Sequence, residues 1–437
     1  MKIKILKGTN EIGGSCVKLS TNSTTILLDY GTPLNNKHNK VYIKEKIDAI
    51  LISHPHQDHF GEIININNKT PIYCGEVSLE LMNATKIFTG NEKLSNNFQH
   101  FKAWEKFTIG DFTIKAFLVD HSATDAYAFL VEANNQRILY SGDFRANGRK
   151  SILFNNMLNN KELKNLDVLI MEGTMMKRDN LNFPDEKSVE NKIHKVITKN
   201  ENLSFLIGSS QNIDNLVSAY RACKKANKIL VIDIYTAWIL EVISKRSNVP
   251  NISWDNIKVI KQFGGTYYEK IKKHPDYFKG FPNKLFKGTI TLEELQKNQS
   301  KYLLKISPWH IDKLLKKIDL SNINIIYSQW LGYLKDEFND EKNVELLIEL
   351  KNKYNWYYTH TSGHANLESL KKFTTALNPR KLIPIHTENK KDFLEHFENV
   401  LILEDNEEYK TGQKLSMYQA NKFNNIFANE LLKKEEK

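Results

Sequence analysis

A dense run of metal-ligand residue types lies near the start of the chain. The run Ser53-His54-Pro55-His56-Gln57-Asp58-His59 comes directly after the apolar segment Ala49-Ile50-Leu51-Ile52, which is typical of a buried strand. Three imidazoles and one carboxylate within six residues supply the nitrogen and oxygen donors that suit zinc or manganese. We interpret this run as a metal site at the end of a strand, in preference to a surface cluster of histidines.

Other ligand-type residues stand just after later segments with strand character. They are His121 after residues 112–119, Asp143 after residues 137–141, and His386 after residues 382–385. A single histidine after a strand is more often structural than a ligand. Here, however, three ligand-type residues each follow a strand-like segment, as the first run does, and together they favour one shared centre. Alternation along the loop points its first two histidines to one side and Asp58 and His59 to another, which predicts two adjacent metal ions that share a bridging carboxylate.

This pattern resembles the metallo-β-lactamase superfamily. The matching motifs are His-x-His-x-Asp-His-x-Gly, then His121-Ser122, then Ser141-Gly142-Asp143, and residues 11–16 and 27–31 are similar to the opening strands of that family. The resemblance implies two divalent metal ions, with Zn²⁺ favoured and Mn²⁺ the alternative. It also implies that Asp29 orients the metal loop rather than binding metal. Our hypothesis for the ligands is His54, His56 and His121 at the first ion, Asp58, His59 and His386 at the second, and Asp143 between them.

The match extends to the β-CASP subgroup, which acts on nucleic acids. Glu172-Gly173-Thr174 resembles the Glu-Ser/Gly-Thr turn of that subgroup, although the usual Tyr-Gly continuation is replaced by Met175-Met176. The resemblance therefore implies a supporting role for Glu172. The acidic motif A of the subgroup matches Asp214 best, with an aspartate on a helix surface as the rival interpretation.

Two further β-CASP motifs bear on the substrate. The segment Ser362-Gly363-His364-Ala365 is similar to motif B of ribonuclease J, in which the histidine that matches His364 contacts the scissile phosphate. Even an ordinary glycine turn before the helix predicted at residues 366–376 would place backbone N–H groups where a phosphate binds well. Motif C matches His386, and members that act on RNA typically have histidine there, whereas DNA-processing members have valine.

The pattern along the chain predicts an α/β protein with two kinds of unit. Short strand patterns with few helices fill the first 170 or so residues, helices and strands alternate after Pro184, and strand, loop, helix and strand return from Trp356. Together with the resemblance, this predicts a metallo-β-lactamase αββα sandwich with an inserted α/β β-CASP cap domain. The expected divisions are 1–180 and 356–425 for the metal domain, 181–355 for the cap, and 426–437 for a charged tail.

Individual elements follow from the same patterns. Strands are expected at residues 2–6, 16–20, 25–29, 49–53, 112–119, 126–132, 137–141, 167–172, 203–207, 229–233 and 323–327. Helices are expected at residues 188–198, 213–225, 291–299 and 311–318, and Thr291 with Glu294 fits a capping box.

Composition sets limits on the partners. The formal charge of +11, from 62 basic and 51 acidic residues, favours a polyanion such as nucleic acid only weakly, because a Lys- and Asn-rich composition gives the same balance. In the cap, Lys224, Lys225 and Lys228 could grip a backbone, but a solvated helix face is the preferred interpretation. Aromatic residues there could stack on bases, although most are expected in the core: Trp238, Tyr267, Tyr268, Trp309 and Trp330.

Other classes are disfavoured. No stretch of about eighteen apolar residues could span a bilayer, and the start of the chain lacks the apolar core of a signal peptide, so a cytoplasmic location is expected. Three cysteines without a paired spacing (Cys16, Cys74 and Cys223) indicate neither a disulfide framework nor a cysteine zinc site.

These observations together predict a metal-dependent ribonuclease that hydrolyses phosphodiester bonds of single-stranded RNA with a hydroxide activated by two metal ions. The candidate catalytic residues are Asp58, His364 and Asp214, with Asp58 able to accept a water proton and His364 able to stabilise or protonate the departing oxygen. The alternatives are a DNA nuclease or other phosphodiesterase of the same fold, a small-molecule hydrolase, which the insertion disfavours, and a non-catalytic RNA-binding scaffold. The sequence does not decide between endonuclease and 5′ exonuclease action, or between a monomer and a homodimer.

Overall fold

The computed structural model describes residues 1–35, 39–178, 181–260, 264–318, 320 and 322–412. The expected charged tail at 426–437, and residues 413–425 before it, lie outside the described residues. None of the helices in the described part combines the length and apolar character that a membrane crossing requires.

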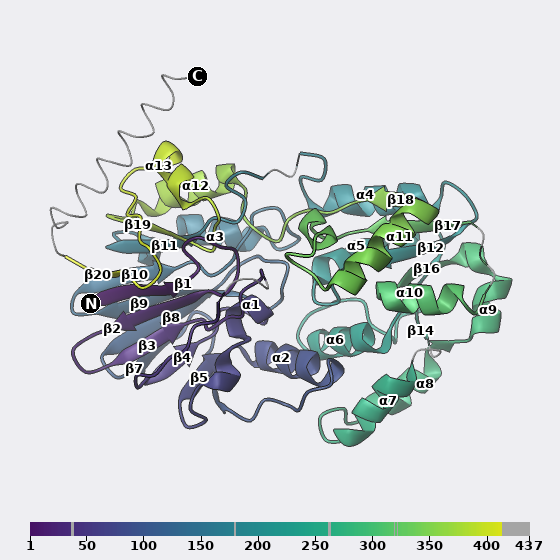
Figure 1. The fold of residues 1–437 in the computed structure, drawn as a ribbon, viewed down its shortest axis with the longest axis horizontal. Helices are drawn as coiled ribbons and strands as arrows, with labels where there is room; N and C mark the ends of the chain where they lie inside the picture. The colour runs from purple at the N-terminus through teal and green to yellow at the C-terminus, as the bar shows by residue number, and fades with distance from the viewer. Residues whose placement is uncertain (36–38, 179–180, 261–263, 319, 321, 413–437) are drawn as a thin grey trace.

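Two sheets face each other in the first part of the structure (Figure 1). The first sheet has the order β20-β1-β2-β3-β4-β5-β6: β1 (Lys2–Lys7), β2 (Cys16–Ser20), β3 (Thr25–Leu28), β4 (Ala49–Leu51), β5 (Pro71–Cys74), β6 (Asn97–His100) and β20 (Glu408–Lys410). The second has the order β19-β11-β10-β9-β8-β7: β7 (Lys106–Ile109), β8 (Phe112–Leu118), β9 (Tyr127–Ala133), β10 (Gln136–Tyr140), β11 (Val168–Glu172) and β19 (Leu382–Ile385). One apolar cluster joins them, with Ile5 and Val17 from the first sheet and Phe129 and Ile138 from the second.

Helices cover the outer faces of both sheets. Phe60 of α1 (Gln57–Phe60) and Met82 of α2 (Glu76–Phe88) pack on the first sheet, and α3 (Ile152–Asn159), α12 (Leu367–Leu377) and α13 (Phe393–His396) pack on the second. The layers therefore run helix, sheet, sheet, helix, which confirms the predicted αββα sandwich.

Few helices precede residue 170, as expected, but α2, which has 13 residues, is not among the elements predicted above. Its buried residues Val77, Leu81, Ala84 and Phe88 recur at helical spacing, so the signal was present in the sequence.

A third sheet carries seven parallel strands in the order β15-β14-β13-β16-β12-β17-β18. They are β12 (Leu203–Ile207), β13 (Ile229–Ile232), β14 (Ile257–Ile260), β15 (Thr289–Ile290), β16 (Tyr302–Lys305), β17 (Ile323–Tyr327) and β18 (Asn355–Tyr358). Strands such as β12 are buried along their whole length, as expected for a parallel sheet covered on both faces. Pairing of β18 with β17 extends this sheet to Tyr358, two residues beyond the expected return point at Trp356.

Helices flank the third sheet on both faces and make it the inserted α/β unit (Figure 1). They are α4 (Glu186–Ile197), α5 (Ile213–Lys225), α6 (Ile234–Ser244), α7 (Gly264–Lys273), α8 (Phe281–Lys287), α9 (Leu292–Lys297), α10 (Pro308–Leu315) and α11 (Glu341–Lys353). The capping box predicted from Thr291 and Glu294 is present at the start of α9. Helix α10 begins three residues earlier than the predicted boundary, because Ser307 caps it and Pro308 occupies its first position.

Candidate metal centre

Strand pairing brings the candidate ligands to one edge of the sandwich. Strands β10, β11 and β19 run parallel, so their carboxyl ends lie together and carry Asp143, Glu172 and His386. In the first sheet β3 and β4 also run parallel, which places Asp29 beside the loop that begins at Ser53. Residues separated by up to 357 positions along the chain (Asp29 to His386) thus meet because of register, not sequence proximity.

Asp29 holds the metal-ligand loop. Its buried carboxylate accepts hydrogen bonds from Ser53 N at 2.6 Å, Ser53 Oγ at 2.7 Å and Tyr140 Oη at 2.7 Å. The same carboxylate lies 2.7 Å from His59 Nδ1. An ionised carboxylate only accepts, so it keeps the proton on Nδ1 and leaves the lone pair of His59 Nε2 free for a metal.

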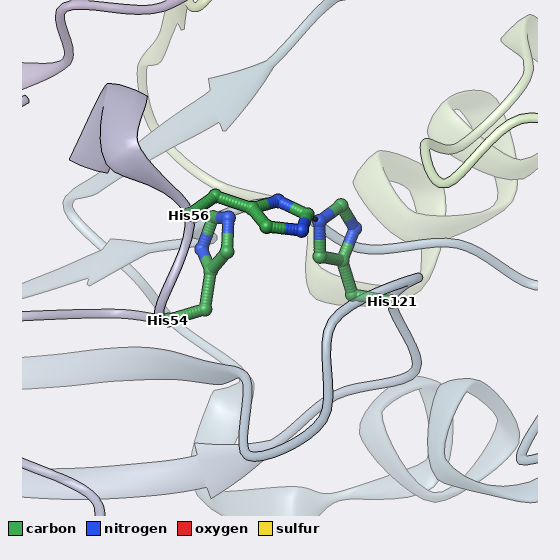
Figure 2. Close-up of side chains that lie close together, drawn as sticks. All are labelled: His54, His56 and His121. Carbon is green, nitrogen blue, oxygen red and sulfur yellow. Dashed lines mark hydrogen bonds between the residues drawn. The ribbon is translucent and has the colours of Figure 1, made fainter. Parts of the chain in front are cut away.

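His54, His56 and His121 form the first group of ligands (Figure 2). Their candidate donor atoms all lie within 4.8 Å of one another, and His121 Nε2 is 3.3 Å from His56 Nδ1. Burial lowers the pKa of His54 well below its ordinary value and lowers that of His56 to about 4. The imidazoles are therefore neutral near pH 7, which is the form that binds metal.

The carbonyl of Gly363 fixes the orientation of His121. His121 Nδ1 donates to this oxygen over 2.5 Å, so Nε2 presents its lone pair to the group. A Cβ atom at Gly363 would stand 2.5 Å from Ser122 Oγ and 3.3 Å from His121 Cε1, so only glycine fits this close approach. The motif B turn and the loop after β8 are thus in direct contact.

Asp58, His59 and His386 form the second group, with donor atoms again within 4.8 Å of one another. His386 Nε2 lies 3.8 Å from Asp58 Oδ2, and His386 Nδ1 lies 2.8 Å from Ser15 Oγ. Gly13 N also donates to His386 Nδ1, at 3.3 Å, and these two contacts hold the ring with Nε2 toward Asp58.

Asp143 lies between the two groups. Its Oδ2 atom is 3.7 Å from His54 Nε2, 3.1 Å from His59 Nε2 and 3.6 Å from His386 Nε2. Burial opposes ionisation of this carboxyl, but the neighbouring histidines, His386 first and then His59, hold its pKa well below its ordinary value. A carboxylate so placed has the position that a bridging ligand requires.

The donor atoms fit a metal centre. Four of them are buried and have no hydrogen-bond partner among the described residues: Nε2 of His54, His59 and His386, and Oδ2 of Asp143. A buried polar atom without a partner costs free energy, and these four all face the same space. Metal ions there would satisfy all of them. The division of ligands between two ions stays a prediction.

His364 and Glu172 form a pair next to this group. His364 Nδ1 lies 3.3 Å from Glu172 Oε1 and 3.7 Å from Asp143 Oδ2. Burial disfavours the imidazolium, but the charges of Glu172 and Asp143 outweigh that effect and raise the pKa of His364. A protonated imidazole beside the ligands can donate a proton to a departing oxygen.

Glu172 also organises the surrounding backbone. It accepts from Ala365 N at 3.3 Å and Thr174 N at 3.1 Å, and Ser362 Oγ accepts from His364 N at 3.1 Å. The N–H groups of residues 364 and 365, predicted to hold a phosphate, are thus engaged within the protein. The side chain of His364 is left as the group of this turn best placed to meet a phosphate.

Asp214 is not brought to the metal ligands. It lies on α5, where its Oδ2 accepts from Arg145 Nη2 at 2.6 Å and from Arg149 N at 2.8 Å. The carboxylate beside the motif B histidine is Glu172, to which sequence reasoning assigned only support. Its position at the end of the apolar run of β11 was the available sequence signal, and strand pairing, which the sequence does not show, places it between the ends that carry Asp143 and His386.

Most of the lysine and aromatic residues that the cap could use for RNA binding have the structural roles preferred for them above. Lys224 and Lys225 are exposed, and Lys225 pairs with Glu190 at 2.5 Å, but Lys228 is buried, so the solvated face predicted for it was wrong. Trp238 is 2% exposed in the core. Tyr267 and Tyr268 pack against the same core cluster, whereas Trp309 is 44% exposed.

Two known families match parts of the chain. Residues 24–230 match the family described as Beta-lactamase superfamily domain, and residues 353–406 match the family described as Zn-dependent metallo-hydrolase RNA specificity domain. The second match includes His364 and His386.

Similar curated proteins carry ribonuclease names. The chain is 27% identical over 276 residues to the RNase J-like protein of Methanocaldococcus jannaschii, a match that covers 59% of this chain and 63% of that protein. It is 20% identical over 355 residues to ribonuclease J of Sinorhizobium meliloti, covering 79% of this chain and 58% of that protein. Both matches span less than two thirds of the relative.

A crystal structure of a protein of unknown function from Enterococcus faecalis V583 is also similar. It is 19% identical, covers 93% of this chain and 99% of that chain, and has a TM-score of 0.73. This likeness shows a shared fold.

Substitution of Asp29 by Asn should weaken metal binding. An amide N–H facing Ser53 Oγ, Tyr140 Oη or His59 Nδ1 would oppose the present hydrogen bonds, and loss of such supporting partners lowers metal affinity about 10–100-fold. Zinc affinity is measured by competition with a chromophoric chelator. Asp111→Asn, which changes an exposed carboxylate bonded to Thr21 and Ser23, is the control. Equal affinities for wild type and Asp29→Asn would contradict the assigned role.

Added zinc should raise the stability of the metal-stripped protein. Binding to the folded state alone stabilises it by about 2.7 kcal/mol per site at a free concentration 100-fold above the dissociation constant. Thermal unfolding with and without zinc measures the effect, which should be lost in the His54→Ala, His121→Ala double variant and kept in His100→Ala, an exposed histidine on β6. A shift of equal size in all three proteins would show binding elsewhere.

Proposed function

Because the chain belongs to the metallo-β-lactamase superfamily, in its β-CASP subgroup, we propose that it is a metal-dependent ribonuclease that hydrolyses phosphodiester bonds of single-stranded RNA. The observation that carries the proposal is the set of buried, unpartnered ligand atoms from His54, His59, His386 and Asp143, with His364 beside them. A non-catalytic scaffold would have no need to keep such a costly set of atoms.

RNA is the favoured substrate for two reasons. The stretch that matches an RNA specificity domain contains both His364 and His386, and the relatives at 27% and 20% identity carry ribonuclease names. The burial of the ligands favours a single strand, since all seven proposed ligands are at most partly exposed and a flexible strand reaches such a centre more easily than a stiff duplex.

The residues divide the chemistry among them. Two bound ions, Zn²⁺ in our proposal, would supply a water activated for attack on phosphorus and would neutralise charge on the phosphate oxygens. Asp58 Oδ2 would accept the proton of the attacking water, and His364, held by Glu172, would donate a proton to the departing oxygen. Asp29 would keep His59 oriented throughout.

Cleavage of end-labelled single-stranded RNA and of DNA of matched sequence tests the proposal. We expect wild type to cleave RNA only when metal is bound. In the Asp58→Ala, His59→Ala double variant the rate of cleavage should fall about 100-fold or more, because two ligands are removed and one of them, Asp58, is the proposed base. His100→Ala serves as the matched control.

The products also decide between the alternatives. Preference for DNA would replace the ribonuclease proposal with a DNA nuclease, and the ladder of products separates endonuclease from 5′ exonuclease action. No cleavage of either polymer by protein that contains bound metal would refute a nuclease function.

Substitution of Glu172 by Gln should slow cleavage while substrate binding is retained. The neutral amide no longer stabilises a protonated His364, and loss of a general acid reduces the rate about 10²–10⁴-fold. Single-turnover cleavage at saturating RNA measures this rate, and a binding assay measures the affinity. Glu162→Gln, which changes an exposed glutamate paired with Lys115, is the control. A pure loss of affinity at an unchanged rate would show that the pair acts in binding.

A further inference from the structure

Arg145 is a fully buried guanidinium that joins three carboxylates. Its Nε lies 3.4 Å from Asp120 Oδ1, its Nη1 lies 3.2 Å from Glu186 Oε1, and its Nη2 lies 2.6 Å from Asp214 Oδ2. Removal of charges from water is unfavourable, so a set of this kind persists only with close pairing. We call Arg145 with these three carboxylates the Arg145 network.

The Arg145 network crosses between the two parts of the protein. Arg145 and Asp120 lie in loops that follow β10 and β8 of the sandwich. Glu186 and Asp214 lie on α4 and α5, which Figure 1 shows among the helices around the third sheet. The cap therefore contributes two of the three carboxylates that a residue of the metal domain requires.

Arg149 adds a second connection across the same boundary. Its backbone N donates to Asp214 Oδ2 at 2.8 Å, and its Nη2 donates to Glu190 at 3.0 Å and to Ser218 Oγ at 2.8 Å. Ser218 Oγ in turn lies 3.0 Å from Glu186 Oε2. The carboxylates of the cap are thus bound by the 145–149 loop at several points.

The same guanidinium reaches the turn that carries His364. Arg145 Nη1 donates to the Ser362 carbonyl oxygen at 3.2 Å, and Asn147 Nδ2 donates to Thr361 Oγ1 at 2.8 Å. The backbone N of Arg145 donates to the Asp120 carbonyl oxygen at 2.6 Å, one residue before His121. Arg145 therefore holds both segments whose contact orients His121, although within the described part of the chain it donates to no proposed metal-ligand atom.

The loop around Arg145 is shaped for this arrangement. A Cβ atom at Gly148 would collide with Arg145 Nε and with both carboxylate oxygens of Asp120. The absence of a side chain at this position lets the backbone close over the ion pair and excludes water from it. Charge-assisted hydrogen bonds are stronger in such surroundings.

We propose that Arg145 is a positioning residue, which fixes the 359–365 turn that carries His364 and the 119–122 loop against each other, anchors both to the cap, and so presents His364 to the scissile phosphate. The planar guanidinium is suited to this task, because its fixed fork bonds several acceptors at once and a lysine ammonium cannot reproduce that geometry. The catalytic part of this inference rests on the proposed function. The positional part rests on the contacts alone.

Two substitutions on opposite sides of the boundary test the proposal: Arg145→Lys in the metal domain and Asp214→Asn in the cap. Arg137→Lys is the matched control, because Arg137 also bonds one carboxylate and two carbonyl oxygens, but within the sandwich. Single-turnover RNA cleavage, RNA affinity, bound metal and hydrogen–deuterium exchange of residues 119–123 and 359–366 are measured on each full-length protein.

We expect the cleavage rate constant to fall about 100-fold in Arg145→Lys and by a smaller factor in Asp214→Asn, as expected when reacting groups are displaced by about 1 Å. Bound metal and RNA affinity should stay within about twofold of wild type, since the proposed ligands are untouched. Exchange should rise in both segments in both variants. Free guanidinium should restore part of the rate in Arg145→Ala.

Three outcomes would overturn the proposal. They are an unchanged rate and exchange pattern, a loss of rate that follows loss of bound metal, and an equal loss in Arg137→Lys, which would indicate general destabilisation. If wild type itself cleaves no RNA, the proposed function fails and exchange alone decides: faster exchange of residues 359–366 in both variants supports the positional role, and unchanged exchange refutes it.

Discussion

Parallel pairing of β19 with β11, and of β11 with β10, is the constraint on which the candidate centre depends. Parallel strands end at the same edge of a sheet, so this pairing places Asp143, Glu172 and His386 together although residues 173–381 intervene. The intervening chain must leave the edge and return to it. It does so as a separate seven-stranded unit, and the return brings the motif B turn with His364 onto the same edge.

Two buried polar clusters meet at this edge, and they differ in their physical state. The metal-ligand cluster is incomplete, since four of its buried donor atoms have no partner within the described chain. In the Arg145 network the guanidinium is instead paired with three carboxylates, and among the described residues only Asp120 Oδ2 of these groups lacks a hydrogen-bond partner. Gly363 and Ser362 link the two clusters through their carbonyl oxygens, to His121 and Arg145 respectively. A buried ion network whose charged groups are paired is suited to holding geometry, whereas a set of unpartnered ligand atoms that face one space is suited to binding an ion.

Much of the fold could be predicted from local patterns. Alternation and buried apolar runs located β1, β8, β11 and β12 to within a residue or two, because those signals depend on near neighbours along the chain. The return point at Trp356 and the motif A residue could not be placed in this way. Strand β18 joins the third sheet through pairing with β17, and Asp214 turned toward Arg145 through packing of α5, and neither partner is visible in a local pattern.

The sequence by itself determined which side chains could bind metal, since residue type and the spacing of residues 54–59 set the chemistry of the donors. Only the tertiary structure decided how those donors are used. It decided that Glu172 pairs with His364 while Asp214 pairs with Arg145, that Asp29 lies against His59 Nδ1, and that Arg145 joins the cap to the motif B turn. The physical reason is that hydrogen bonds and ion pairs are chosen by distance in space, which strand register and domain packing set across hundreds of residues.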